Sequence, residues 1–208
     1  MSSDKHQLRS AMRALRKQLA AANPYAAEQV VQHLPDLLEM MFAGSGSFAD
    51  EQKDRRFTAA VYKAQGSELD ALPLAKALME RDVDLALPVA TAQEQPLIFR
   101  RWSPRDPLEI DVSGVPAPLP LAEAVTPDVL FVPLLAADDR GYRLGQGGGY
   151  YDRTLGALRK AEPRLWAQPW FIGLGYSGQM VERIAEELHD QPLHGVLTET
   201  GYTPARKV

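Results

Sequence analysis

The sequence predicts an α/β fold built on a mostly parallel sheet with helices on both faces. Short apolar runs typical of buried strands, such as DLALPV at 84–89 and VLFVPLLA at 129–136, alternate with segments of helical periodicity. Strands that alternate with helices favour parallel pairing, and a parallel sheet is covered on both faces. The length of 208 residues, without an internal repeat or low-complexity tract, predicts a single domain over 1–208.

The first part of the chain is predicted to be helical. Leucine and methionine side chains spaced by three and four positions indicate one amphipathic helix over 4–21. Asn23-Pro24 is typical of a helix start with proline at the first helical position, and Pro35 should interrupt the second helix before the apolar run DLLEMMF. The polar segment 43–56, which carries glycine and serine, is expected to be the most mobile loop.

The rest of the chain reads as alternating elements. Pro73 is expected to restart the helix in which it lies, and the proline-rich passage 103–125 is expected to run over the surface. The predicted strands are 57–62, 84–89, 96–102, 129–136, 170–176 and 195–199, and the predicted helices are 68–82, 151–161 and 179–189.

The composition excludes several classes of protein. Apolar residues make up 45% and charged residues 24% of the chain, as in ordinary globular proteins. We expect a cytoplasmic protein with no membrane partner, because no apolar run approaches the roughly 20 residues of a membrane span and the polar first residues do not resemble a secretory signal. Without cysteine the chain has no disulfide or thiolate zinc site. A net charge of −4 gives no general attraction to nucleic acid, so any anion site must be local.

The segment RGYRLGQGGGYYDR, 140–153, predicts such an anion site. Glycines stand at four of five consecutive positions, between a predicted strand and a predicted helix: Gly145, Gly147, Gly148 and Gly149. Without Cβ atoms, several amide N–H groups can approach a phosphate, and the start of the helix adds its own. Arg143 and Arg153 flank the loop and suit phosphate oxygens. The alternative is a tight turn without a ligand.

Known phosphate motifs do not match this loop. A Walker loop ends in Gly-Lys-Ser/Thr, whereas this one ends in Gly149-Tyr150-Tyr151, and a dinucleotide fingerprint needs a glycine where Tyr150 stands. Asp152 would repel a polyphosphate unless a cation lay between them, which points to Mg²⁺. An aspartate in the first turn of a helix can also serve only to favour the helix dipole.

The loop resembles the signature of a known family. RLGQGGGYYDR, preceded by DVLFVPLLAADDRGY, is similar to the signature of the 5-formyltetrahydrofolate cyclo-ligase family. Three other segments agree with the family in order and spacing, namely KHQLR, VYKAQGSELDALPLAKALMERDVDLALPVA and HDQPLHGVLTE. The resemblance implies a fold similar to that of the sugar-phosphate isomerases and CoA-transferases, and a monomeric enzyme of one-carbon metabolism whose partner is a small molecule.

The resemblance also implies a reaction. ATP and Mg²⁺ would drive conversion of 5-formyltetrahydrofolate into 5,10-methenyltetrahydrofolate, with release of ADP and phosphate. The γ-phosphoryl group would pass to the formyl oxygen, and the folate N10 would then close the ring, a reaction that depends on positioning and charge stabilisation. Two alternatives remain, a non-catalytic folate- or nucleotide-binding module and an ATP-dependent enzyme of the same fold with another substrate.

Site residues follow from the match to the family motif. The implied ATP-binding residues are Lys5, Arg9, Arg143, Leu144, Gly145, Gln146, Gly147, Gly148, Gly149, Tyr150 and Tyr151. The implied folate-binding residues are Arg9, Lys63, Glu68, Gln146, Gly147, Gly148, Gly149 and Tyr150. Arg143 and Tyr151 are the implied catalytic residues, and Asp152 is the implied Mg²⁺ ligand. Without the resemblance, a solvated helix face is the preferred interpretation of Lys5 and Arg9, whereas Glu68 would equally suit a helix start.

The chain departs from the family pattern at two positions. His194 stands where many members carry an aspartate that is associated with the magnesium site, and histidine is a poorer Mg²⁺ ligand, so a second ligand is expected to be missing or replaced by water. Ala117 stands where relatives commonly place an acidic residue, so any contact of that carboxylate is lost.

Overall fold

The computed structural model describes residues 2–42, 56–161 and 169–206. Within these residues the main sheet has eight strands, and neighbours from β2 to β11 pair in parallel, whereas β3 and β12 run antiparallel to the strands beside them. In spatial order the strands are β12 (Gly201–Pro204), β11 (Gly195–Thr198), β10 (Trp170–Leu174), β7 (Val129–Pro133), β1 (Thr58–Ala60), β2 (Asp84–Val89), β3 (Ile98–Arg101) and β6 (Ala124–Val125). The predicted mostly parallel sheet is confirmed.

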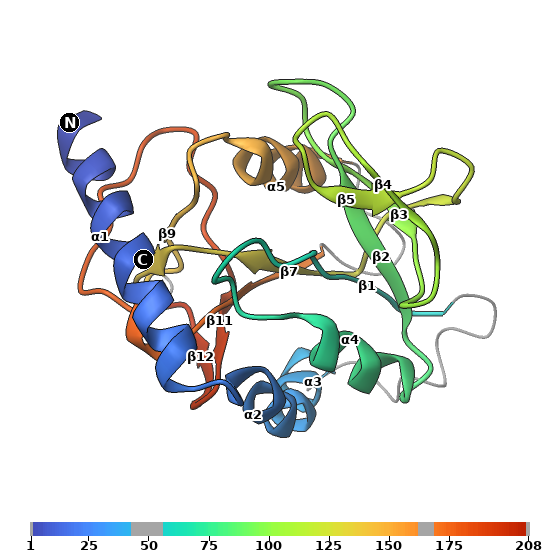
Figure 1. Cartoon of the computed structure of the whole chain (residues 1–208), viewed down its shortest axis with the longest axis horizontal. Helices are drawn as coiled ribbons and strands as arrows, with labels where there is room; N and C mark the ends of the chain where they lie inside the picture. Colours follow the sequence, from blue (N-terminus) through green and yellow to red (C-terminus); the bar gives the residue numbers. More distant parts are fainter. Residues whose placement is uncertain (1, 43–55, 162–168, 207–208) are drawn as a thin grey trace.

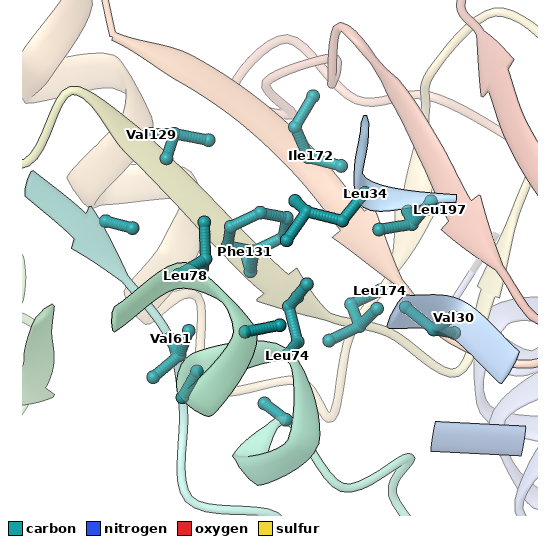
Figure 2. Packing of buried hydrophobic residues seen from close by; sticks show 14 of the residues in the cluster. Val30, Leu34, Val61, Leu74, Leu78, Val129, Phe131, Ile172, Leu174 and Leu197 are labelled. Carbon is teal, nitrogen blue, oxygen red and sulfur yellow. The ribbon is translucent and has the colours of Figure 1, made fainter. Parts of the chain in front are cut away.

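Helices cover both faces of this sheet, as predicted. On one face lie α2 (Ala26–Gln32), α3 (Leu34–Phe42) and α4 (Leu72–Met79), and on the other lies α5 (Tyr150–Lys160) (Figure 1). Leu74 and Leu78 of α4 and Leu34 of α3 pack against Phe131 and Ile172 of the strands (Figure 2). Each such fully buried side chain contributes about 1.5–3 kcal/mol, so the two apolar layers hold the sheet in place.

The N-terminal helix α1 (Ser2–Ala22) lies beside the end of the sheet where β11 and β12 are found (Figure 1). Met12 of α1 packs in a separate apolar cluster with Leu135, Leu144 and Ile184. Leu144 belongs to the short hairpin of β8 (Ala136–Ala137) and β9 (Arg143–Leu144), which leads into the glycine loop. The apolar face of α1 thus fixes this helix against the loop.

The predicted helix over 179–189 is wrong. The structure has a single 3₁₀ turn there, η1 (Ser177–Gln179), followed by irregular chain. The Val181 N–H donates to the Ala137 carbonyl (2.8 Å), and the Ile184 N–H donates to Oδ2 of buried Asp138 (3.0 Å). Arg140 also donates to the Ile184 carbonyl at 2.8 Å. These distant partners take the backbone groups that a helix would use, an effect that helical periodicity cannot reveal.

Two other helix boundaries differ from the prediction. The helix predicted over 68–82 begins only at Leu72, after a turn in which Asp70 accepts the Leu72 N–H (3.0 Å). The second helix begins at Ala26, not at Pro24, because a turn joins the Ala26 N–H to the Asn23 carbonyl (3.3 Å). The second helix is interrupted as predicted, but the break falls at His33, so that Leu34 and Pro35 belong to the first turn of α3.

Short strands account for most of the remaining differences. The predicted strand 57–62 is shortened to β1 and the predicted strand 129–136 divides into β7 and β8. The passage 103–125, predicted as surface chain, contains a hairpin of β4 (Leu108–Ile110) and β5 (Pro116–Pro118) and also β6, and β12 was not predicted either. The predicted mobile loop falls on 43–55, outside the described residues, apart from its last position. Within the described residues no helix is long and apolar enough to span a membrane.

Candidate active site

A cavity of about 480 Å³ lies near the carboxyl ends of the parallel strands. Pro88 near the end of β2, Pro133 at the end of β7 and Tyr62 after β1 contribute to its wall. Open α/β sheets place ligands at this edge. All the residues that the family motif implies for the site line this one cavity, namely Lys5, Arg9, Lys63, Glu68, Arg143, Leu144, Gly145, Gln146, Gly147, Gly148, Gly149, Tyr150, Tyr151 and Asp152. Arg153, which the sequence also suggested for phosphate, is not part of the lining, and its Nη2 donates to the Gly148 carbonyl at 2.8 Å.

The glycine loop forms one side of the cavity with its backbone. Gly147 (φ 108°) and Gly149 (φ 66°) adopt left-handed conformations that favour glycine, and Gly149 caps α5. A Cβ atom added to Gly145 would meet nothing within 4 Å. Arg9 of α1 donates from Nε to the Gly145 carbonyl at 3.1 Å, which places a cation beside the bare peptide units. A helix start, exposed amides and a guanidinium together suit an anion.

Arg143 and Asp152 form an ion pair at the base of the loop. Arg143 Nη2 lies 2.9 Å from Asp152 Oδ1, and Arg143 Nη1 donates to the Gln191 carbonyl at 2.7 Å. The same Asp152 oxygen accepts the Gln191 N–H at 3.1 Å. Burial lowers the pKa of Arg143, and the charge of Asp152 partly offsets this effect, so Arg143 stays a cation. The pair thus holds the start of α5 against the segment around Gln191.

The cavity lining also includes two carboxylates that were not predicted, Glu187 and Asp190. Lys5 Nζ lies 3.1 Å from both Glu187 Oε1 and Asp190 Oδ2, and these two residues line the cavity with His189. Burial would lower the pKa of Lys5, but the two carboxylates outweigh it and raise the pKa. The ligand atoms of Glu187, His189 and Asp190 lie within 4.8 Å of one another. The sequence did contain a signal for Asp190, because His189 and Asp190 open the tail segment that matches the family. The wrong prediction of a helix over 179–189 hid its significance.

Glu68 forms the far wall of the cavity. Its side chain is 9% exposed, one oxygen accepts from Arg16 Nη1 at 3.3 Å, and the other accepts the Gln65 N–H at 2.9 Å. Burial and the charge of Glu68 raise the pKa values of Tyr62 and Tyr151, so both phenols stay neutral. Because Tyr151 also packs against the apolar core below α5, this tyrosine seats the helix. Tyr150 stays half-buried on the cavity wall with the Arg153 guanidinium 5.2 Å from its ring centre.

The β4–β5 hairpin also lines the cavity, and sequence reasoning missed it. Asp111 closes the turn of the hairpin and accepts the Ala90 N–H (2.8 Å) and the Val115 N–H (3.2 Å). Burial would raise the pKa of Asp111, but these bonds and those from Ser113 lower it. Ala117 is buried in β5 and does not belong to the cavity lining. The hairpin is therefore fixed to the end of β2 by a carboxylate.

His194 lies outside the cavity lining. Its Nδ1 accepts the Phe171 N–H at 2.8 Å, and its ring packs against the rings of Trp170 and Phe171 at 4.9 and 5.5 Å. Burial and the charge of Arg159 lower the pKa of His194, which suits a neutral imidazole. The departure at this position therefore concerns a residue outside the cavity lining, whereas Asp152 and Asp190 both line the cavity.

Comparisons with known proteins agree with the fold and with the motif. A family model described as the 5-formyltetrahydrofolate cyclo-ligase family matches residues 1–199. A protein of Haemophilus influenzae named 5-formyltetrahydrofolate cyclo-ligase is 32% identical over 201 residues, which cover 93% of this chain and 96% of the relative. A protein of the same name from Escherichia coli K12 is 35% identical over 152 residues, covering 68% of this chain and 77% of the relative.

Solved structures show the same similarity. The chain matches the structure of Aquifex aeolicus 5,10-methenyltetrahydrofolate synthetase with a TM-score of 0.69 and 26% identity, over 98% of this chain and 94% of that chain. A synthetase of the same name from Mycoplasma pneumoniae matches with a TM-score of 0.64, over 94% of this chain and 99% of that chain. At 21% identity this second match supports the fold alone.

Proposed function

The chain belongs to the 5-formyltetrahydrofolate cyclo-ligase family, and we propose that it is an enzyme that uses ATP and Mg²⁺ to convert 5-formyltetrahydrofolate into 5,10-methenyltetrahydrofolate. The observation that carries the proposal is one cavity lined both by a glycine loop and by Glu68, whose side chain is 9% exposed. The loop suits the phosphates of ATP, and the glutamate suits the N–H groups of a pterin. One cavity can therefore hold both substrates.

The chemistry explains why ATP is needed. The formyl group on N5 is an amide, so its carbon is a weak electrophile and its oxygen a poor leaving group. In the proposed reaction the formyl oxygen forms a bond to the γ-phosphorus, the bond from that phosphorus to the β,γ-bridging oxygen breaks, and ADP leaves. N10 then attacks the activated carbon and loses its proton to solvent, and the carbon–oxygen bond breaks to release phosphate. Positioning N10 beside the carbon makes this ring closure intramolecular.

The residues on the loop side stabilise charge. The loop amides and the Arg9 guanidinium would contact phosphate oxygens, and Arg143 adds a buried positive charge that does not depend on pH near neutrality. Lys5 forms ion pairs with Glu187 and Asp190, so it would exchange a carboxylate partner for phosphate when it binds ATP. Tyr151 stays protonated because burial raises its pKa, so its hydroxyl remains a hydrogen-bond donor.

The donor set near α5 fits Mg²⁺. One oxygen of Asp152 accepts from Arg143 and from the Gln191 amide, and within the described part of the chain no hydrogen bond occupies the other oxygen. Asp190 lines the same cavity and precedes Gln191 directly, so two carboxylates lie at the phosphate side. Mg²⁺ prefers such hard oxygen ligands together with phosphate and water. When bound, the ion would neutralise charge that develops on the transferred phosphoryl group.

The proposal includes a monomeric enzyme of the cytoplasm. The absence of cysteine fits a reducing compartment.

The proposal is tested with purified protein, 5-formyltetrahydrofolate, ATP and Mg²⁺. The expected result is growth of the near-ultraviolet absorbance of the methenyl product, which stops when ATP is omitted. ATP hydrolysis that does not respond to formylfolate would indicate an enzyme with another substrate. Binding of both ligands without turnover would indicate a non-catalytic module, and either result would contradict the proposal.

A further inference from the structure

Arg16 is a buried arginine that lies behind the cavity. It is 5% exposed and sits on α1, about two turns after Arg9 and hence on nearly the same face. Arg16 is outside the residues that line the cavity, whereas Glu68, its ion-pair partner, is among them. Arg16 therefore contacts the cavity wall through its ion pair with Glu68.

The contacts of Arg16 fix the orientation of the Glu68 carboxylate. Arg16 Nη1 donates to Glu68 Oε1 (3.3 Å), and Arg16 Nε donates to Ser67 Oγ (3.2 Å), so one guanidinium contacts two consecutive side chains of this turn. The other oxygen of Glu68 accepts the Gln65 N–H (2.9 Å). With a contact on each oxygen, the carboxylate is held in one plane. The planar guanidinium group of an arginine orients a carboxylate better than the ammonium group of a lysine, because its N–H donors are fixed relative to one another.

The surroundings of Glu68 bear on the role of its cationic partner, Arg16. Burial raises the pKa values of Tyr62 and Tyr151, the buried phenols that interact electrostatically with Glu68, so neither carries a charge near neutral pH. The side chains of Arg16 and Glu68 are 6% and 9% exposed, so solvent screens the glutamate little. A buried ion pair adds little net stability compared with apolar residues of the same volume, so stability alone does not account for this one.

We propose that Arg16 is a positioning residue for folate recognition, which holds Glu68 as an oriented carboxylate so that it accepts hydrogen bonds from the pterin ring. This inference rests on the proposed function. It extends that function to a residue that touches neither substrate.

A purely structural role for Arg16 predicts a different result. Arg9 and Arg13 on the same helix contact Gly145 and Gln146 of the glycine loop, so a general displacement of α1 would disturb the ATP side as well. Loss of the Arg16 contact alone should affect only the Glu68 side. The KM for formylfolate and the KM for ATP therefore distinguish positioning from simple stabilisation.

The test measures both KM values, kcat and the melting temperature of the wild type, Arg16→Ala and Arg16→Lys. Lys17→Ala is the matched control, since Lys17 is the next residue of α1 and is exposed. In Arg16→Ala the KM for formylfolate should rise about 10- to 100-fold, the range expected on losing a charged hydrogen bond. The KM for ATP should change less than about twofold. Arg16→Lys should restore part of the affinity, because an ammonium can contact Glu68 but cannot also bridge to Ser67.

Glu68→Gln and the double variant complete the test. If Arg16 acts through Glu68, then adding Arg16→Ala to Glu68→Gln should raise the KM for formylfolate no further. Additive effects, equal rises in both KM values, or a lower melting temperature with unchanged KM values would overturn the inference. If Arg16→Ala does not fold, Arg16→Lys and Arg16→Gln supply the same comparison. An inactive wild type would overturn the proposed function, whereas an active wild type with an unaffected Arg16→Ala would overturn this inference alone.

Discussion

The two sides of the cavity are built in different ways. The glycine loop presents exposed peptide units that lie within a few positions of one another in the chain, and two of its glycines adopt left-handed conformations. The Glu68 side is a buried side-chain network in which the partner of Glu68 is Arg16, separated from it by 52 positions. The difference teaches that a backbone site can be recognised as a local motif, whereas a side-chain site depends on contacts that only the fold brings together.

The largest effect is expected from Gly148→Val, which changes the glycine loop, the backbone side of the cavity. A Cβ atom at Gly148 would lie 3.1 Å from a Tyr150 ring carbon, so the valine must displace that ring or the loop. Because Gly148 is exposed, the fold should persist while turnover falls by about 10³-fold or more, since the phosphate donors lose their geometry. Steady-state kinetics and circular dichroism measure the two properties.

Gly156→Ala is the matched control for that variant. It lies on α5, and its Cβ atom would meet only the Gln191 side chain, at 3.7 Å or more, which is ordinary contact. Near-normal activity is expected from Gly156→Ala. Near-normal activity of Gly148→Val would show that the loop does not hold the phosphates.

Glu68→Gln changes the side-chain side of the cavity and should lower activity less than Gly148→Val does. The amide replaces two acceptor oxygens with one acceptor and one donor, so pterin N–H groups lose a partner. The KM for formylfolate should rise about 10- to 100-fold with little change in the KM for ATP. The opposite pattern, a rise for ATP alone, would reverse the assignment of the two sides.

Asp152→Asn tests the proposed Mg²⁺ site at the glycine loop. Loss of the charge should raise the Mg²⁺ concentration needed for half-maximal activity by about tenfold, because Mg²⁺ prefers carboxylate oxygens. The control is Asp139→Asn, an exposed carboxylate paired with Arg206 and absent from the cavity lining. A Mg²⁺ titration of the three proteins gives the comparison, and an unchanged curve for Asp152→Asn would remove this residue from the metal site.

The sequence predicted the backbone side more fully than the side-chain side. The glycine loop, the parallel sheet and Asp152 follow from local patterns, and Glu68 was found through a matched segment. Arg16, Asp111 and Asp190 were missed. The place of Arg16 depends on the contact of α1 with a distant turn, that of Asp111 on a hairpin of strands too short to recognise, and that of Asp190 on the chain just before it, which was wrongly predicted as a helix over 179–189. In that segment Asp138 and Arg140 supply partners from elsewhere in the fold, which no periodicity encodes.

The smallest effect is expected at His194, which belongs to neither side. Burial lowers the pKa of His194 in the folded protein. In the unfolded chain the imidazole binds a proton from about pH 6.5 downward, whereas in the folded chain it does so only at lower pH. The free energy of unfolding should therefore fall as the pH decreases from 7 to 5. In His194→Asn, whose amide oxygen can still accept the Phe171 N–H, this part of the pH dependence should disappear while both KM values stay unchanged. Urea midpoints measured at pH 7, 6 and 5 give the change of stability with pH. If the midpoint changes with pH equally in the wild type and in His194→Asn, the pH dependence does not come from His194.

A crystal structure with Mg²⁺, a non-hydrolysable ATP analogue and 5-formyltetrahydrofolate tests the division of the cavity most directly. The triphosphate should lie on the amides of 145–149 with the metal at Asp152, and the pterin N–H groups should donate to Glu68. A nucleotide bound elsewhere, or a pterin that does not contact Glu68, would contradict the account.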